Sequence, residues 1–97
     1  MGRTNGTYRM RVQQFEEEWQ PFRRALRARY QNNFDDLIEK AELFSNAAGM
    51  QNPVHAYRTI LFSIALAQEV ERKQLESRTD ELEERIAALE DELGDAV

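Results

Sequence analysis

Apolar residues recur at helical spacing along the first part of the chain. Between residues 8 and 26 they fall three or four positions apart, at Tyr8, Val12, Phe15, Trp19, Phe22 and Leu26. This spacing places them on one face of an α-helix. Because Pro21 lacks a backbone N–H group, we expect the helix to break or kink at Gln20-Pro21. Thr7 is the expected N-cap, and residues 1–6 are expected to form a flexible tail.

The helical pattern continues from residue 22 to residue 48 without a change of phase. The polar pair Asn32-Asn33 lies inside it, and two interpretations stay open there: a turn in which Asn33 caps a new helix, or one long helix. The unbroken phase favours one long helix. We expect Gly49 to end this region as a left-handed cap, and Asn52-Pro53 to begin the next helix.

The last part of the chain predicts one helix from about residue 53 to about residue 93, roughly 60 Å long at about 1.5 Å per residue. In residues 54–70 apolar side chains surround the helix axis, so we expect burial on two sides, by the chain's own helices and by a second subunit. No segment shows strand periodicity. The predicted fold is all-α: an N-terminal helical hairpin over residues 7–50, packed on a long C-terminal helix over residues 53–97.

A narrow heptad stripe marks the end of this helix, over about residues 71–93. Leu75, Leu82 and Leu89 recur every seven residues, and Thr79, Ile86 and Leu93 recur every seven residues between them. These spacings place the first series at d and the second at a of a coiled coil. Isoleucine at a with leucine at d favours two parallel strands. The chain is therefore expected to form a homo-oligomer, most simply a parallel dimer.

Most of the charged residues beside the stripe favour the same arrangement, although Glu71 would face Glu76 of the partner chain, which is unfavourable. Arg78 and Arg85 occupy g positions, and Glu83 and Glu90 occupy e positions. In a parallel pair each arginine faces a glutamate of the partner, whereas an antiparallel pair sets like charges together. Three heptads are short, so a four-helix arrangement built on residues 54–70 also stays open. The expected oligomer interface consists of Leu61, Ile64, Leu75, Thr79, Leu82, Ile86, Leu89 and Leu93.

Charge is unevenly distributed along the 97 residues, which carry a net charge of −5. Residues 1–31 contain seven Arg and three Glu, and the remainder contains six basic and fifteen acidic residues. The Arg-rich start is open to two interpretations: contact with nucleic-acid phosphates, or neutralisation of the acidic surface. The acidic total favours neutralisation. The candidate nucleic-acid contacts are Arg3, Arg9, Arg11, Arg23, Arg24 and Arg27.

Residues that carry catalysis or bind metals are scarce. There is no Cys, and His55 is the single His, so we expect neither a zinc site of the usual kind nor a Ser-His-Asp arrangement. The acidic run at residues 16–18 is interpreted as a solvated helix face, because consecutive carboxylates on a helix point in different directions. We expect no cofactor, no metal and no enzymatic activity. No apolar run is long enough to cross a membrane.

Several segments of the chain resemble a family of small helical proteins of unknown function from halophilic archaea, namely residues 1–5, 7–9, 22–27, 34–35 and 47–53. The resemblance implies a cytoplasmic protein adapted to high salt, and it brings no activity and no site residues. The basic residues, eleven Arg and two Lys, are also typical of such a proteome. The function expected is therefore a coiled-coil assembly or adaptor protein with an unknown protein partner, and the alternative is a small dimeric DNA-binding regulator.

Overall fold

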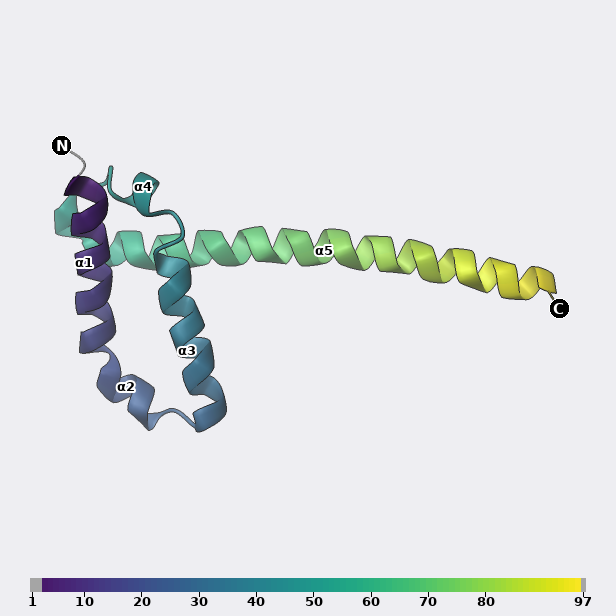
Figure 1. The fold of residues 1–97 in the computed structure, drawn as a ribbon, viewed down its shortest axis with the longest axis horizontal. Coiled ribbons are helices and arrows are strands. Elements are labelled where there is room, and N and C mark those ends of the chain that lie inside the picture. The colour runs from purple at the N-terminus through teal and green to yellow at the C-terminus, as the bar shows by residue number, and fades with distance from the viewer. Residues whose placement is uncertain (1–2, 97) are drawn as a thin grey trace.

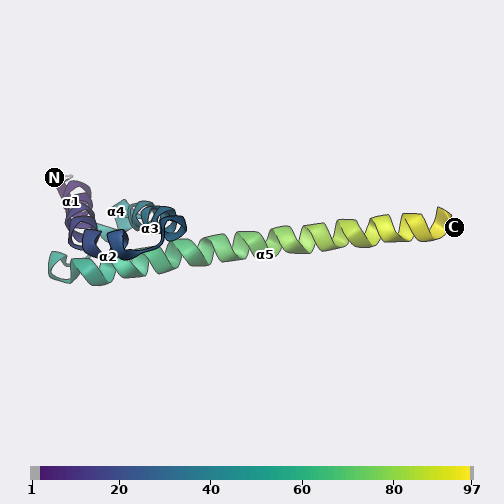
Figure 2. The same cartoon turned by 90° about the horizontal axis from the view of Figure 1, so that it is seen from below.

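The chain forms an elongated molecule built from helices in a computed structural model that describes residues 3–96, with side chains from Tyr8 onward (Figure 1). Its elements are α1 (Arg3–Glu18), α2 (Gln20–Ala25), α3 (Ala28–Ala41), α4 (Ser45–Ala48), a short 3-10 helix η1 (Pro53–His55) and α5 (Ala56–Ala96). We call α1 to α4 the head. Figure 2 shows the head on one side of α5. These elements confirm the predicted all-α class.

The first two helix boundaries are set by α1 and Pro21. Helix α1 begins at Arg3, so the expected start at Thr7 is wrong and most of the expected tail, residues 3–6, belongs to this helix. Residues 1 and 2 lie outside the described part of the chain. The expected break at Gln20-Pro21 is confirmed: α1 ends at Glu18, and α2 begins with Pro21 in its first turn.

The single long helix expected over residues 22–48 is wrong, because the chain leaves helical geometry twice. The first break lies at Leu26 and Arg27, whose extended backbones have ψ angles of 151° and 150°. The Gln31 side-chain amide donates to the carbonyls of Arg23 and Leu26, at 3.2 and 3.3 Å. It thereby gives a donor to the Leu26 carbonyl at the end of α2 and a second donor to the Arg23 carbonyl, which also accepts the Leu26 N–H at 3.0 Å. Asn32-Asn33 is no turn and lies inside α3.

The second break follows Ala41, where a short turn leads into α4. The Ser45 hydroxyl donates to the Glu42 carbonyl at 2.6 Å and stabilises this turn. After α4 the chain turns with right-handed geometry, and Gly49 has φ −65° and ψ −14°. The expected left-handed cap at Gly49 is therefore wrong. Asn52 caps the next helix as expected, since its side-chain oxygen accepts the Val54 N–H at 3.0 Å.

The core lies where α1, α3 and α4 meet the first part of α5. It consists of Tyr8, Val12, Phe15, Phe34, Ile38, Ala41, Ala48 and Ile60, with Leu26 and Ile64 packed against it. On α5, Ile60 is flanked by buried Ala56, Ser63 and Ala67, and their small side chains let the head helices approach closely. Within one chain residues 54–70 are buried on the side that faces the head, and burial of a second side by another subunit stays a prediction. Leu61 and Phe62 are 57% and 71% exposed.

A chain of aromatic rings continues the core along one edge of the head. Phe15 stacks on Trp19 at 5.5 Å between ring centroids and meets the edge of Tyr57 at 5.2 Å. Trp19 in turn meets the edge of Phe22 at 5.2 Å. These rings join α1, α2 and α5.

Candidate functional site

The end of α5 projects far beyond the head, and we call residues 72–96 the stalk (Figure 1). The molecule measures 65 × 36 × 17 Å, and its radius of gyration is 20.0 Å. A compact chain of this length has a radius of gyration of about 12–13 Å. Just before the stalk begins, the Lys40 ammonium meets the Glu71 carboxylate at 3.3 Å. Every described side chain of the stalk is exposed.

The heptad stripe therefore has no covering within its own chain. Its apolar residues are exposed by 66% at Leu75, 42% at Leu82, 54% at Ile86, 57% at Leu89 and 68% at Leu93, and Thr79 is exposed as well. In proteins most of the stability of a helix comes from the packing of its apolar face rather than from helix propensity. A narrow apolar stripe between charged faces is the pattern that a coiled-coil partner covers.

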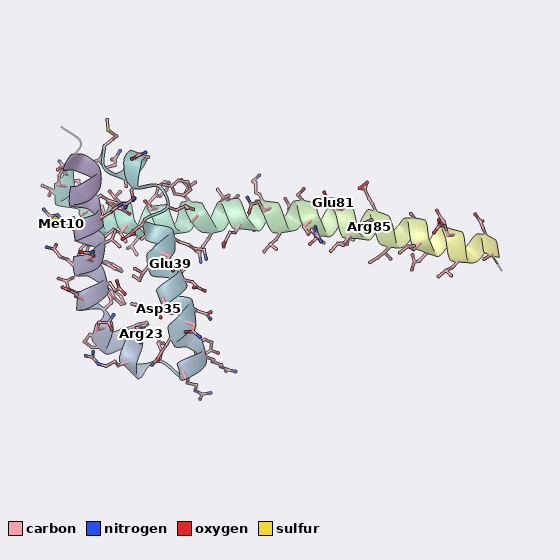
Figure 3. All side chains as sticks on the ribbon, viewed as in Figure 1. Met10, Arg23, Asp35, Glu39, Glu81 and Arg85 are labelled. Atoms are coloured by element: carbon pink, nitrogen blue, oxygen red, sulfur yellow. The ribbon has the colours of Figure 1, made fainter. Side chains whose placement is uncertain are left out.

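Charged side chains flank the stripe on both sides, and Figure 3 shows Glu81 and Arg85 on the stalk clear of the head. At the start of the stalk Arg72 occupies an a position. Its guanidinium makes two hydrogen bonds of 3.0 Å to Glu69 and an ion pair of 3.6 Å with Glu76. These glutamates raise the pKa of Arg72, and the Arg72 hydrogen bonds lower the pKa of Glu69. Two carboxylates of the same helix, Glu69 and Glu76, thus pair with Arg72, the cation that interrupts the stripe.

Two residues of the expected oligomer interface lie farther back on α5, beside the head. Leu61 is exposed and lies fourteen residues before Leu75, in the same heptad position. Ile64 is partly buried and packs against the chain's own core. Within one chain it helps to pack the head on α5, and its place in the oligomer interface stays a prediction.

The arginines proposed to contact nucleic acid do not form one cluster. Arg9 and Arg11 are exposed on α1, and Arg24 and Arg27 are exposed at the far end of α2; Figure 1 places α2 at the opposite end of the head from the N-terminus. The side chain of Arg3 lies outside the described side chains. Arg9 and Arg11 therefore do not share one basic surface with Arg24 and Arg27.

Arg23 has a structural role that the sequence analysis missed. Its guanidinium binds both carboxylate oxygens of Asp35 at 2.8 Å, which ties α2 to α3. Figure 3 shows the two side chains facing each other across the turn. The hydrogen bonds lower the pKa of Asp35 and raise that of Arg23. Twelve residues separate the pair, so only knowledge of the break at Leu26 would have brought them together.

A second surface lies on another side of α5, between this helix and α4. It is an open groove of about 480 Å³, and its lining includes the exposed side of Phe62 together with Leu66 and Phe44. Successive helical residues are about 100° apart around the axis, so Phe62 points away from the face that carries Leu61. The groove and the heptad stripe can therefore be occupied at the same time.

Comparison with known proteins gives a family and no function. A family model described as a domain of unknown function (DUF8156) matches residues 1–96. No curated protein and no solved structure matches the chain. Across the described residues, no helix combines the length and the apolar character that crossing a membrane requires.

Proposed function

The chain belongs to the family described as a domain of unknown function (DUF8156), and we propose that it is a non-enzymatic assembly protein that forms a parallel homodimer through its stalk. The observation that carries the proposal is the uncovered heptad stripe on a helix that extends well beyond the head. Burial of leucine and isoleucine is worth about 1.5–3 kcal/mol for a side chain that passes from full exposure to full burial. A second copy supplies the same stripe and offers that burial to both chains.

A second copy is favoured over an unrelated helix by the charges of the chain itself. In a parallel pair Arg78 faces Glu83 of the partner chain, and Arg85 faces Glu90 of the partner chain. Each exposed pair contributes little energy, but a like-charge arrangement is unfavourable, so the charges select orientation. Leu61 lies on the continuation of the same stripe and extends the contact toward the head.

The mass of the protein in solution tests this proposal. One chain has a mass of 11.4 kDa, and the dimer has twice that mass in sedimentation equilibrium or light scattering. Leu89→Asp places a charge in the stripe and is expected to yield monomers. Ala88→Asp, one residue earlier on the outer face, introduces the same side chain and is expected to leave the dimer intact. A monomeric parent protein, or equal loss of the dimer in both variants, would overturn the proposal.

The adaptor role follows from what the dimer leaves free. Two heads lie at the same end of a parallel pair, and each carries the groove between α4 and α5 on a face that the stripe does not use. We propose that this groove binds an apolar segment of a protein partner. Photo-crosslinking from position 62 is expected to capture that partner in both the parent protein and the Ala88→Asp variant, whereas crosslinks only to this chain itself would contradict the adaptor role.

We favour protein assembly over nucleic-acid binding for two reasons taken from the arginines. Arg23 is engaged by Asp35, and the exposed arginines are divided between α1 and the end of α2. The acidic total of the chain opposes nonspecific attraction to a phosphate backbone. We also propose that the acidic, arginine-rich composition reflects a cytoplasm of high salt, as in the halophilic archaea whose proteins this chain resembles.

A further inference from the structure

An open pocket of about 520 Å³ lies between α1 and the start of α5. Its volume is in the range of small-molecule sites, about 300–1,000 Å³. The cationic residues in its lining are Arg11 from α1 and Arg58 from α5, and His55 lies beside them. Glu18 is the only carboxylate in the lining. This pocket is separate from the heptad stripe and from the Arg23–Asp35 pair, and it shares Arg58 and His55 with the groove between α4 and α5.

Neither arginine of the pocket forms an ion pair within the described part of the chain; the ion pairs there involve Arg23, Lys40 and Arg72. The Glu18 carboxylate accepts a hydrogen bond from the Tyr57 hydroxyl instead. That bond, burial and the Glu18 charge raise the pKa of Tyr57, against the opposing charge of Arg11. In a chain with 18 acidic residues, the two guanidinium groups thus remain available to an anion from outside.

The start of α5 adds to this positive potential. The N-terminal end of a helix carries a partial positive charge, and acidic residues are favoured in its first turn. Helix α5 has 41 residues and no acidic residue in its first turn, where Arg58 lies instead. Arg58 and the helix end therefore carry charge of the same sign, and Glu18 is the one carboxylate in the pocket lining that opposes it.

We propose that this pocket binds a phosphate group of a small ligand, with Arg11 and Arg58 as its two charged contacts. The planar guanidinium group offers two parallel N–H donors to phosphate oxygens, which makes arginine well suited to this anion. Gln14 also lines the pocket and supplies an amide donor. All of these residues come from one chain, so the site does not depend on the dimer.

Titration with inorganic phosphate, followed by 31P NMR at low ionic strength, tests the proposal. The expected result is saturable binding of one phosphate per chain. Arg11→Gln and Arg58→Gln are each expected to weaken binding about tenfold, the loss of one charge-assisted contact. Arg24→Gln removes an exposed arginine of α2 that lies outside the pocket, and it is expected to leave the affinity unchanged. Circular dichroism verifies that all three variants remain folded.

Removal of the one carboxylate gives a change in the opposite direction. Glu18→Gln is expected to tighten phosphate binding about threefold, because a like charge leaves the pocket while the amide still accepts the Tyr57 hydroxyl. Absence of saturable binding would overturn the proposal, and so would equal weakening by Arg11→Gln, Arg58→Gln and Arg24→Gln.

A second arm of the experiment identifies the source of the phosphate group. Duplex DNA presents the same group in a polymer, and it is titrated against the parent protein and the same variants. A small ligand as the source predicts that DNA does not displace bound inorganic phosphate. If DNA displaces bound phosphate and the displacement depends on Arg11 and Arg58, the phosphate site is supported. The same result contradicts a small ligand as the source of the phosphate group.

Discussion

Tyr8 of α1 donates a hydrogen bond of 2.5 Å to the carbonyl of Ala41, the last residue of α3. Both residues are buried. The last carbonyls of a helix have no donor within the helix, so a buried helix end needs one from elsewhere. This bond supplies it across 33 residues of sequence and fixes the place where α3 can end against α1.

Loss of the Tyr8 hydroxyl is expected to destabilise the head. Tyr8→Phe keeps the ring but leaves the buried Ala41 carbonyl without its donor, at a cost of about 1–2 kcal/mol in the free energy of unfolding. Urea denaturation followed by circular dichroism measures this change. Tyr30→Phe is the matched control, because the Tyr30 ring is 43% exposed. Equal effects of the two substitutions would contradict the role of the Tyr8 bond.

Alkaline pH is expected to weaken the same contact. Burial raises the pKa of Tyr8, against an opposing hydrogen bond with Ser63. A raised pKa in the folded state gives stability that is present below the unfolded value of about 10 and is lost as the pH rises through the folded value. Urea midpoints between pH 9 and pH 11 should therefore fall more steeply in the parent protein than in Tyr8→Phe. Parallel curves would contradict this prediction.

Substitutions at the neighbouring residues Ile60 and Leu61 of α5 are expected to affect the stability of one chain very differently. Ile60 has no exposed surface, whereas Leu61 is 57% exposed in the single chain. In the Leu89→Asp background, Ile60→Ala should lower the free energy of unfolding by about 2–5 kcal/mol, through lost burial and a cavity. Leu61→Ala should change it by less than about 0.5 kcal/mol. A larger loss at Leu61 would show that the stripe is covered within one chain.

Acid is expected to weaken the tie between α2 and α3. The Arg23 hydrogen bonds hold the pKa of Asp35 below its ordinary value. The stability that this gives is present above the unfolded pKa of about 3.9 and is lost as the pH falls through the folded value. Asp35→Asn should therefore be less stable than the parent protein at pH 7, with the difference vanishing toward pH 2. If the stability difference persists in acid, its cause is packing rather than the charge of Asp35.

Reversing the charge of Arg85 is expected to weaken the proposed dimer, and reversing the charge of Glu90 as well is expected to restore it. Arg85→Glu sets glutamate against Glu90 of the partner chain twice in each dimer and should raise the dissociation constant about tenfold. Arg85→Glu combined with Glu90→Arg in the same chain restores both attractive pairs and should recover the parent value. Sedimentation velocity measures both. Failure of the double variant to recover would contradict the parallel arrangement.

The sequence was sufficient to predict the elements that local chemistry determines. Pro21 and Asn52 acted as expected, because a missing backbone donor and a side-chain cap work over only a few residues. The break at Leu26 could not be predicted, since the neighbouring residues favour helix and the hydrophobic phase continues across it. It depends on Gln31 and on the Arg23–Asp35 pair, whose members meet only once the chain has turned.

The heptad stripe and the pocket between α1 and α5 also differ in how far the sequence predicts them. The stripe on the stalk follows from a seven-residue period, so the sequence alone predicts it. The pocket between α1 and α5 brings Arg11 and Arg58 together across 47 positions, and no periodicity relates them. Its one sequence signal is the absence of an acidic residue where α5 begins, just after the His55 position.

The distance between spin labels on two copies of the stalk tests the central claim most directly. The chain has no Cys, so Ser77→Cys, Glu84→Cys and Asp91→Cys each carry one label on the outer face. A parallel pair predicts the same inter-label distance at all three positions. An antiparallel pair would make the axial separations differ by about 20 Å or more. Equal distances are the result that we predict, and unequal distances or the absence of dipolar coupling would contradict it.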